Sequence, residues 1–128
     1  MPEGFAAWVE SLDPLGQVFL SAVSIHELEK GVRRLEARGA RQKARALDSW
    51  LRPLVARHAG FILPVDAEVA RVSGDLEARA IAAGFNSGAS DAMIAGTAQH
   101  HGLILLTRNV KHFEPFGISV SVVEGLDL

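Results

Sequence analysis

Apolar and polar positions change their spacing along this chain, and the changes predict strands and helices in alternation. Short apolar runs rich in β-forming residues predict buried strands at 17–23, 61–65, 103–107 and 118–123. The first helix has apolar residues at three-to-four residue spacing, namely Ile25, Leu28, Val32 and Leu35. Strands that alternate with helices favour an α/β fold, with a parallel sheet flanked by helices.

Local signals predict where the helices begin and end. The first helix should end near Gly39, a residue type that favours helix C-termini. The second should run from about Ala40 to Leu54, with Pro53 as a kink or a break. Asp66 can cap the third helix, and Asp91 opens a fourth that is rich in small residues.

Length and composition narrow the class of protein. A chain of 128 residues predicts one domain, residues 1–128, with an ordinary soluble composition. No apolar run approaches the roughly 20 residues that span a bilayer, and no signal-peptide pattern opens the sequence. The absence of cysteine excludes disulfides and suits a cytoplasmic protein. A net charge of −2 means that any contact with nucleic acid must be local.

Glu27 has two interpretations. Ser24 and Glu27 match the S-x-x-E capping box, in which both side chains satisfy N–H groups at a helix start. However, helices in right-handed crossovers begin at the carboxyl edge of a parallel sheet. Glu27 and Asp91 begin helices, and Asn109 follows a strand, so all three should lie at the edge where open α/β sheets bind ligands.

Carboxylates gathered at one edge would suit a hard cation. Mg²⁺ and Mn²⁺ prefer oxygen ligands, and such an ion can activate water against a phosphodiester. Asp91 also has a structural interpretation, because acids in a first helical turn favour the helix dipole. Asn109 is a weaker candidate, since an Asn after a strand is commonly a turn residue. No P-loop, G-x-S-x-G or G-x-G-x-x-G motif is present, which argues against kinase, serine hydrolase and dinucleotide-binding functions.

One stretch is densely basic. It is either a solvated surface or a local patch that could meet a phosphate backbone, and it contains Arg33, Arg34, Arg38, Arg41, Lys43 and Arg45.

Three stretches together resemble a known family. FLSAVSIHELEKG, SDAMIAGTAQHHGLILLTRN and NVKHFEPFGISV, in this order, are similar to a PIN domain of the VapC or FitB type, over about residues 5–124. These are toxin ribonucleases of type II toxin–antitoxin modules. The resemblance implies a three-layer α/β fold and an Mg²⁺- or Mn²⁺-dependent endoribonuclease. It also implies a homodimer and a small VapB-like antitoxin as partner.

The resemblance also assigns roles to individual residues. Glu27 and Asp91 match acidic positions that are catalytic and bind metal, and Asn109 falls where members carry Asp or Asn. His112 stands where relatives often carry an acid. The basic stretch, and not the resemblance, makes Arg33, Arg34 and Arg38 the candidates for RNA contact. The positions of small hydroxyl residues beside the site are matched by Ser21, Ser24 and Thr107.

The largest departure lies at the beginning. The family opens with a central strand that ends in a metal-ligand Asp, whereas MPEGFAAWVESLDP resembles the segment after it, and Asp13 does not match. An empty central position would leave backbone groups of two strands unpaired. The neighbours could close up, another chain could supply a strand, or the natural protein could have a longer N-terminus.

Two functions follow as alternatives. With two matched carboxylates we expect weak metal affinity and low or absent turnover, so the first is an RNA-cleaving toxin of doubtful activity. The second is an inactive PIN-fold module that binds an antitoxin or oligomerises without cleaving RNA. A general DNA-processing nuclease is disfavoured, because the domain is small and acidic.

Overall fold

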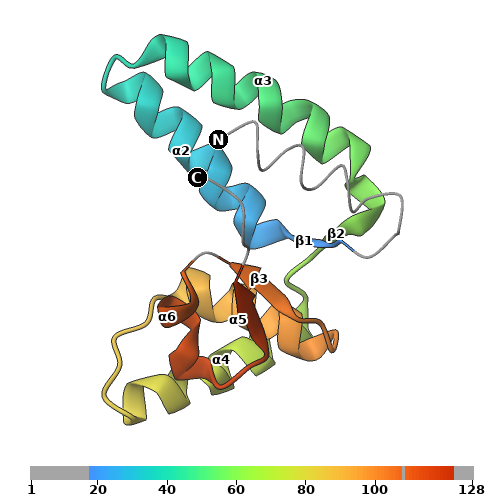
Figure 1. The fold of residues 1–128 in the computed structure, drawn as a ribbon, viewed down its shortest axis with the longest axis vertical. Coiled ribbons are helices and arrows are strands. Elements are labelled where there is room, and N and C mark those ends of the chain that lie inside the picture. Colours follow the sequence, from blue (N-terminus) through green and yellow to red (C-terminus); the bar gives the residue numbers. More distant parts are fainter. Residues whose placement is uncertain (1–17, 108, 123–128) are drawn as a thin grey trace. The chain divides into compact units, whose positions relative to one another are not determined.

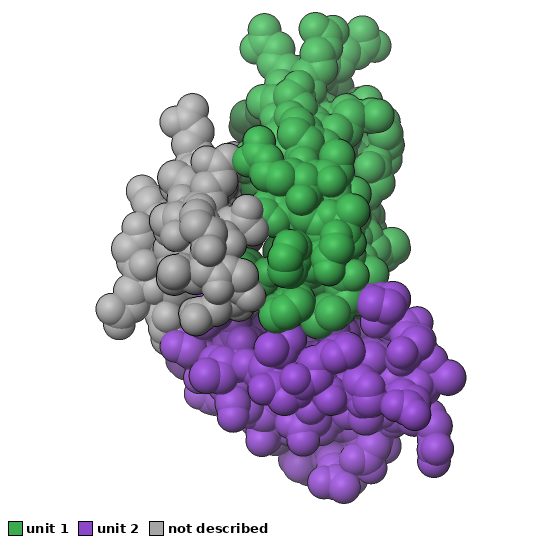
Figure 2. All heavy atoms as spheres, turned by 90° about the vertical axis from the view of Figure 1, so that its right-hand side faces the viewer, with its two compact units in different colours: residues 1–63, 126–128 green, residues 64–125 purple. Residues whose placement is uncertain are grey.

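The computed structural model describes residues 18–107 and 109–122, and Figure 1 shows their helices and strands. The chain forms two compact units, residues 1–63 with 126–128 and residues 64–125 (Figure 2). In both units short parallel strands are joined to helices, which confirms the predicted α/β class. Within the described ranges, no helix is both long and apolar enough to cross a membrane.

The first unit contains a pair of helices, α2 (Ala22–Ala37) and α3 (Arg41–Arg57). Their shared core has Val32 and Leu51 at its centre, and the predicted stripe of α2 lines it. Gly39 has a φ of +84° in the turn after α2, as its predicted role at the helix end requires. Pro53 lies inside α3 without ending the helix, so of the kink or break predicted there the break is wrong. Leu51 and Leu54, on either side of it, are both buried, and their packing keeps this segment helical.

The strands of the first unit are shorter than predicted. β1 (Leu20–Ser21) pairs in parallel with β2 (Ile62–Leu63), and a 3-10 turn, η2 (Ala59–Phe61), precedes β2. Val23, which the apolar run assigns to the strand, is instead a buried residue of α2. The apolar run therefore continues from strand into helix without a change in composition.

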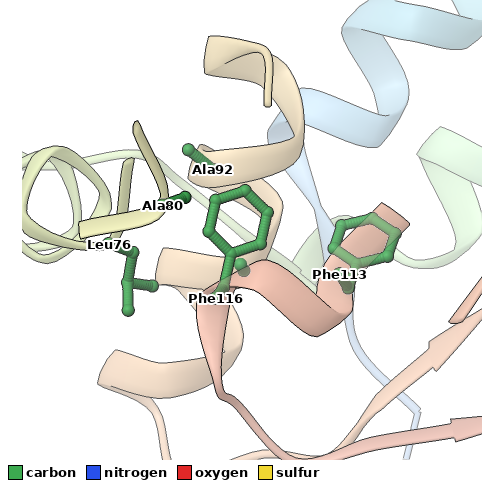
Figure 3. Packing of buried hydrophobic residues seen from close by; sticks show 6 residues of the cluster. Leu76, Ala80, Ala92, Phe113 and Phe116 are labelled. Atoms are coloured by element: carbon green, nitrogen blue, oxygen red, sulfur yellow. The ribbon is translucent and has the colours of Figure 1, made fainter. Parts of the chain in front are cut away.

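The second unit is built around α4 (Ala67–Ala82) and α5 (Ala89–His100). The carboxylate of Asp66 accepts a hydrogen bond from the Val69 N–H at 2.9 Å, which confirms the predicted cap of α4. Two phenylalanines close the core against these helices (Figure 3), and the buried cluster comprises Leu76, Ala80, Ala92, Ala95, Phe113 and Phe116. Phe113 and Phe116 come from α6 (Val110–Phe113) and the 3-10 turn η3 (Glu114–Phe116).

The helices α4 and α5 lie very close together at Gly96. A Cβ atom added to Gly96 would lie 2.9 Å from both Cα and Cβ of Ser73, and would overlap its Oγ. Ser73 is itself buried and donates a hydrogen bond to the Val69 carbonyl at 2.7 Å. Only a residue without a side chain fits at position 96 with this spacing of the helices.

The second unit also contains a parallel strand pair, β3 (Leu105–Thr107) and β4 (Val120–Val122). Leu105 lies opposite Val120, and Thr107 lies opposite Val122. Among the described strands, β1 therefore pairs only with β2, and β3 only with β4. The absence of the family's central strand stays a prediction, because residues 1–17, Asp13 included, lie outside the described residues.

Candidate functional site

Ser21 provides the cap at the start of α2. Its Oγ accepts a hydrogen bond from the Val23 N–H at 3.1 Å, and α2 begins at the next residue, Ala22. Ser24 lies inside the first turn and Glu27 in the second. The predicted capping box of Ser24 and Glu27 is therefore wrong, because a hydroxyl directly after β1 caps the helix one turn earlier.

The carboxylate of Glu27 is held by neighbours on its own helix. Its Oε2 lies 2.8 Å from Nζ of Lys30, and its Oε1 lies 3.5 Å from Nδ1 of His26. The Glu27 side chain is 34% exposed and that of Lys30 is 50% exposed. An ion pair this exposed is worth at most about 1 kcal/mol, so a competing cation could replace Lys30.

Asp91 lies in the first turn of α5, whose N-cap residue, Gly88, makes no side-chain cap. Its carboxylate therefore faces the positive end of the helix dipole, as its structural interpretation requires. The side chain is 36% exposed, and Oδ2 lies 3.9 Å from Nδ1 of His112 on α6. The helix dipole and a ligand role are compatible, because the same exposed oxygen could serve both.

The segment after β3 forms a turn stabilised by a side chain. Thr107 is the last residue of β3, and its Oγ1 accepts a hydrogen bond from the Asn109 N–H at 3.0 Å. Asn109 then precedes α6 and makes no side-chain cap. Its exposed side chain is thus at a turn, the structural interpretation that the sequence also allowed.

Within the second unit, the start of α5 and the segment after β3 meet. The pair of Asp91 and His112 joins them, as expected for a helix that begins at the carboxyl end of a parallel strand. The sequence predicted that Asp91 lies at this edge, but it assigned His112 no part in the site. The position of His112, five residues after the end of β3, was the signal that could have placed it beside Asp91. Glu27 belongs to the other unit, so its convergence with Asp91 stays a prediction.

A divalent cation at Asp91 would find few protein ligands. Among the described residues, no group of three or more His, Cys, Asp or Glu side chains could hold a metal ion. Mg²⁺, however, commonly takes one or two protein carboxylates and completes its shell with water. The partly exposed carboxylate of Asp91 fits a weakly held, hydrated cation and does not fit a site closed by protein ligands.

The basic candidates differ in their surroundings. Arg33 donates hydrogen bonds to Glu36 at 2.9 Å and to Glu29 at 2.7 Å, and these bonds raise the pKa of Arg33. Arg34 and Arg38 are exposed at the end of α2 and take no part in the ion pairs among described residues. Their charges are therefore the more available ones for a phosphate, and that of Arg33 is locally compensated.

The chain is similar to known proteins in sequence and in structure. The PIN domain family matches residues 2–115. VapC ribonuclease Y4jK of Sinorhizobium fredii is 32% identical over 116 residues, which are 89% of this chain and 79% of that protein. Toxin FitB of Neisseria gonorrhoeae is 35% identical over 122 residues, 94% of this chain and 83% of that protein. The structure of FitAB bound to an IR36 DNA fragment has a TM-score of 0.76 and 29% identity, covering 98% of this chain and 86% of that chain.

Proposed function

Because this chain belongs to the PIN-domain family, we propose that it is a metal-dependent endoribonuclease, the toxin of a type II toxin–antitoxin pair. Its relatives bear the names of a ribonuclease and of a toxin. The observation that supports the proposal most directly is the exposed carboxylate of Asp91 beside the segment that follows β3. Ligands of open α/β sheets bind at this end of the strands.

Each candidate residue would have its own role in RNA cleavage. When bound, Mg²⁺ or Mn²⁺ would supply an activated water and neutralise charge on the phosphodiester. Asp91 would hold the cation through its carboxylate, and Glu27 stays the second predicted carboxylate. Ser21 and Thr107 act as positioning residues, because their hydroxyls already accept hydrogen bonds from the backbone. Asn109 can add a neutral oxygen.

The partners follow from the same proposal. The solved relative FitAB is named for a pair, and we infer a small antitoxin as the partner of this chain. The toxin would act as a homodimer on RNA. Arg34 and Arg38 are the arginines proposed to contact its phosphates, because neither is engaged in the ion pairs among described residues.

RNA cleavage tests the proposal. A single-stranded RNA is incubated with the chain over a titration of Mn²⁺ and Mg²⁺, alongside Glu27→Gln and Asp91→Asn. Asp75→Asn is the matched control, since Asp75 is an exposed acid of the same unit that pairs with Arg79 at 3.1 Å. We expect cleavage that requires the metal, is lost in both site variants and is retained in the control. Equal cleavage in the presence of a chelator, or by Asp91→Asn, would contradict the proposal.

A second function is favoured by one observation, the lack of any three-ligand group among the described residues. On this alternative the chain is an inactive PIN-fold module that holds an antitoxin. The same assay separates the two when it includes a form with any in-frame codons upstream of Met1. If both forms bind the antitoxin but neither cleaves RNA at any metal concentration, the chain is a binding module.

A further inference from the structure

Two groups of cations lie on the pair of helices α2 and α3. Lys30, Arg33 and Arg52 pair with carboxylates on their own helices, at nitrogen–oxygen distances between 2.7 and 2.9 Å. The second group surrounds the turn between the helices, at the end of the pair away from β1 (Figure 1). We call it the hairpin tip, and it consists of Arg34, Arg38, Arg41, Lys43 and Arg45. All five are exposed, and none of their side chains takes part in a hydrogen bond or ion pair among the described residues.

The positive charge of the hairpin tip is not balanced by nearby acids. The sequence has no Asp or Glu from Ala37 to Leu47. Glu36, just before this segment, accepts a hydrogen bond from Arg33 at 2.9 Å, and Asp48, just after it, pairs with Arg52. A chain with a net charge of −2 therefore gathers uncompensated positive charge at one place.

A fixed turn holds the cations of both helices in place. Gly39, whose φ is +84°, donates its N–H to the carbonyl of Glu36 at 3.0 Å. The N–H of Ala40 is donated to the carbonyl of Leu35 at 2.9 Å. These two hydrogen bonds form a Schellman motif at the end of α2. The backbone of the hairpin tip is thus ordered before any ligand binds.

Two of the cations lie where they disfavour their own helix. Arg41 and Lys43 belong to the first turn of α3, which has no acidic residue, and the N-cap residue Ala40 makes no side-chain cap. Because the helix dipole places partial positive charge at this end, acids are favoured there and cations are not. Residues that lower local stability without a contact in return indicate a function other than folding.

The surroundings of the hairpin tip favour a polyanion over a folded protein as its ligand. Protein interfaces are centred on large apolar and aromatic side chains, and α2 and α3 carry no exposed large hydrophobic residue. From Arg38 to Leu47, the exposed residues other than the cations are Gly39, Gln42 and Ala46. Arginine binds phosphate oxygens through a planar fork of N–H groups, and interfaces with nucleic acids are polar and positively charged.

We propose that the hairpin tip is an RNA exosite, which binds the phosphate backbone of the substrate away from the bond that is cut. The inference rests on the proposed function, and it extends the contact of Arg34 and Arg38 to the start of α3. Glu27 and Arg38 lie about 16 Å apart along α2, at a rise of about 1.5 Å per residue. The hairpin tip and this candidate carboxylate would therefore meet different nucleotides. Phosphate contacts position a nucleic acid without reading its sequence, so the exosite adds affinity and not sequence specificity.

A solvated surface is the competing explanation, and charge reversal at the start of α3 separates the two. Arg41→Glu and Lys43→Glu each place an acid at the positive end of the helix dipole, so neither should lower stability under either explanation. An exosite predicts that RNA affinity falls nonetheless, whereas a solvated surface predicts no change. Arg71→Glu is the matched control, because Arg71 is an exposed cation of α4 outside the ion pairs among described residues.

The test is the fluorescence anisotropy of a labelled single-stranded RNA of about 16 nucleotides, with a chelator present so that binding is measured without cleavage. At about 0.1 M salt, each reversal should weaken binding about fivefold and the double variant about 25-fold, since one phosphate contact contributes about 0.7 to the log–log salt slope. Arg71→Glu should bind RNA as the parent chain does. Urea denaturation should give midpoints for the two reversals that equal or exceed that of the parent chain.

Four results would overturn the inference. They are an unchanged RNA affinity in the double variant, an equal loss in Arg71→Glu, a urea midpoint below that of the parent chain in either reversal, and binding of polyglutamate as tight as that of RNA. Where the chain cleaves RNA, the reversals should raise KM and leave kcat unchanged. RNA that binds through the hairpin tip but is never cut would leave this inference standing and remove the proposed activity.

Discussion

Gly96→Ala should destabilise the second unit, because the added methyl has no space between α4 and α5. Its Cβ would meet Cα and Cβ of Ser73 at 2.9 Å and overlap Oγ, so rotation of the serine side chain cannot relieve the contact. Overpacking of a tight core costs up to about 3 kcal/mol. Replacing glycine by alanine within a helix returns about 1 kcal/mol. The expected net loss is about 2 kcal/mol of the free energy of unfolding.

Gly74→Ala is the matched control for this substitution. Gly74 also lies inside a helix of the pair, α4, but no heavy atom is found within 4 Å of a Cβ built there. The methyl should therefore meet only solvent, and the variant should gain about 0.5–1 kcal/mol through helix propensity. The same chemical change is thus predicted to have opposite signs at two positions of one helix pair.

Urea denaturation followed by far-UV circular dichroism measures both variants against the parent chain. The midpoint should fall for Gly96→Ala and rise for Gly74→Ala, with similar slopes. If Gly96→Ala were as stable as the parent chain or more so, the two helices could not be as close at Ser73 as described. The packing argument for the second unit would then fail.

Two further predictions concern the first unit. Ser21→Ala should lower the free energy of unfolding by about 1 kcal/mol, because the Val23 N–H loses its hydrogen-bond acceptor. Ser24→Ala should leave thermal stability nearly unchanged. A larger loss for Ser24→Ala than for Ser21→Ala would show that Ser24 caps the helix after all. Arg34→Ala and Arg38→Ala should each make RNA binding less sensitive to salt. In fluorescence anisotropy titrations, the slope of the logarithm of the binding constant against the logarithm of the salt concentration should become shallower by about 0.7. Arg33→Ala, whose guanidinium is bound by Glu29 and Glu36, should leave that slope unchanged, and an equal drop would contradict the assignment.

Periodicity and end signals predicted the helices well wherever local chemistry decides them. The apolar stripe of α2, its end before Gly39 and the cap at Asp66 all depend on residues within one or two turns. The start of α2 was misplaced because Ser21 and Ser24 are both good caps, and only the end of β1, a long-range pairing, selects Ser21. Of the kink or break predicted at Pro53, the break does not occur, because burial on both sides outweighs the local preference.

The candidate site depends more on long-range packing. Topology alone placed Asp91 near the end of β3, since helix and strand directions are linked in parallel sheets. The packing of Phe113 into the core decides which residue after β3 faces Asp91. The sequence does not show that Nδ1 of His112 comes within 3.9 Å of Oδ2 of Asp91. The pairing of Glu27 with Lys30, by contrast, follows from their i,i+3 spacing.

The central claim is that Asp91, in the first turn of α5 beside the segment after β3, binds the metal ion on which the proposed cleavage depends. Calorimetric titration of Mn²⁺ into the parent chain, Asp91→Asn and the control Asp75→Asn tests it most directly. We predict one ion per chain, a weakened affinity in Asp91→Asn and an unchanged affinity in Asp75→Asn. An unchanged Mn²⁺ affinity in Asp91→Asn would contradict the claim.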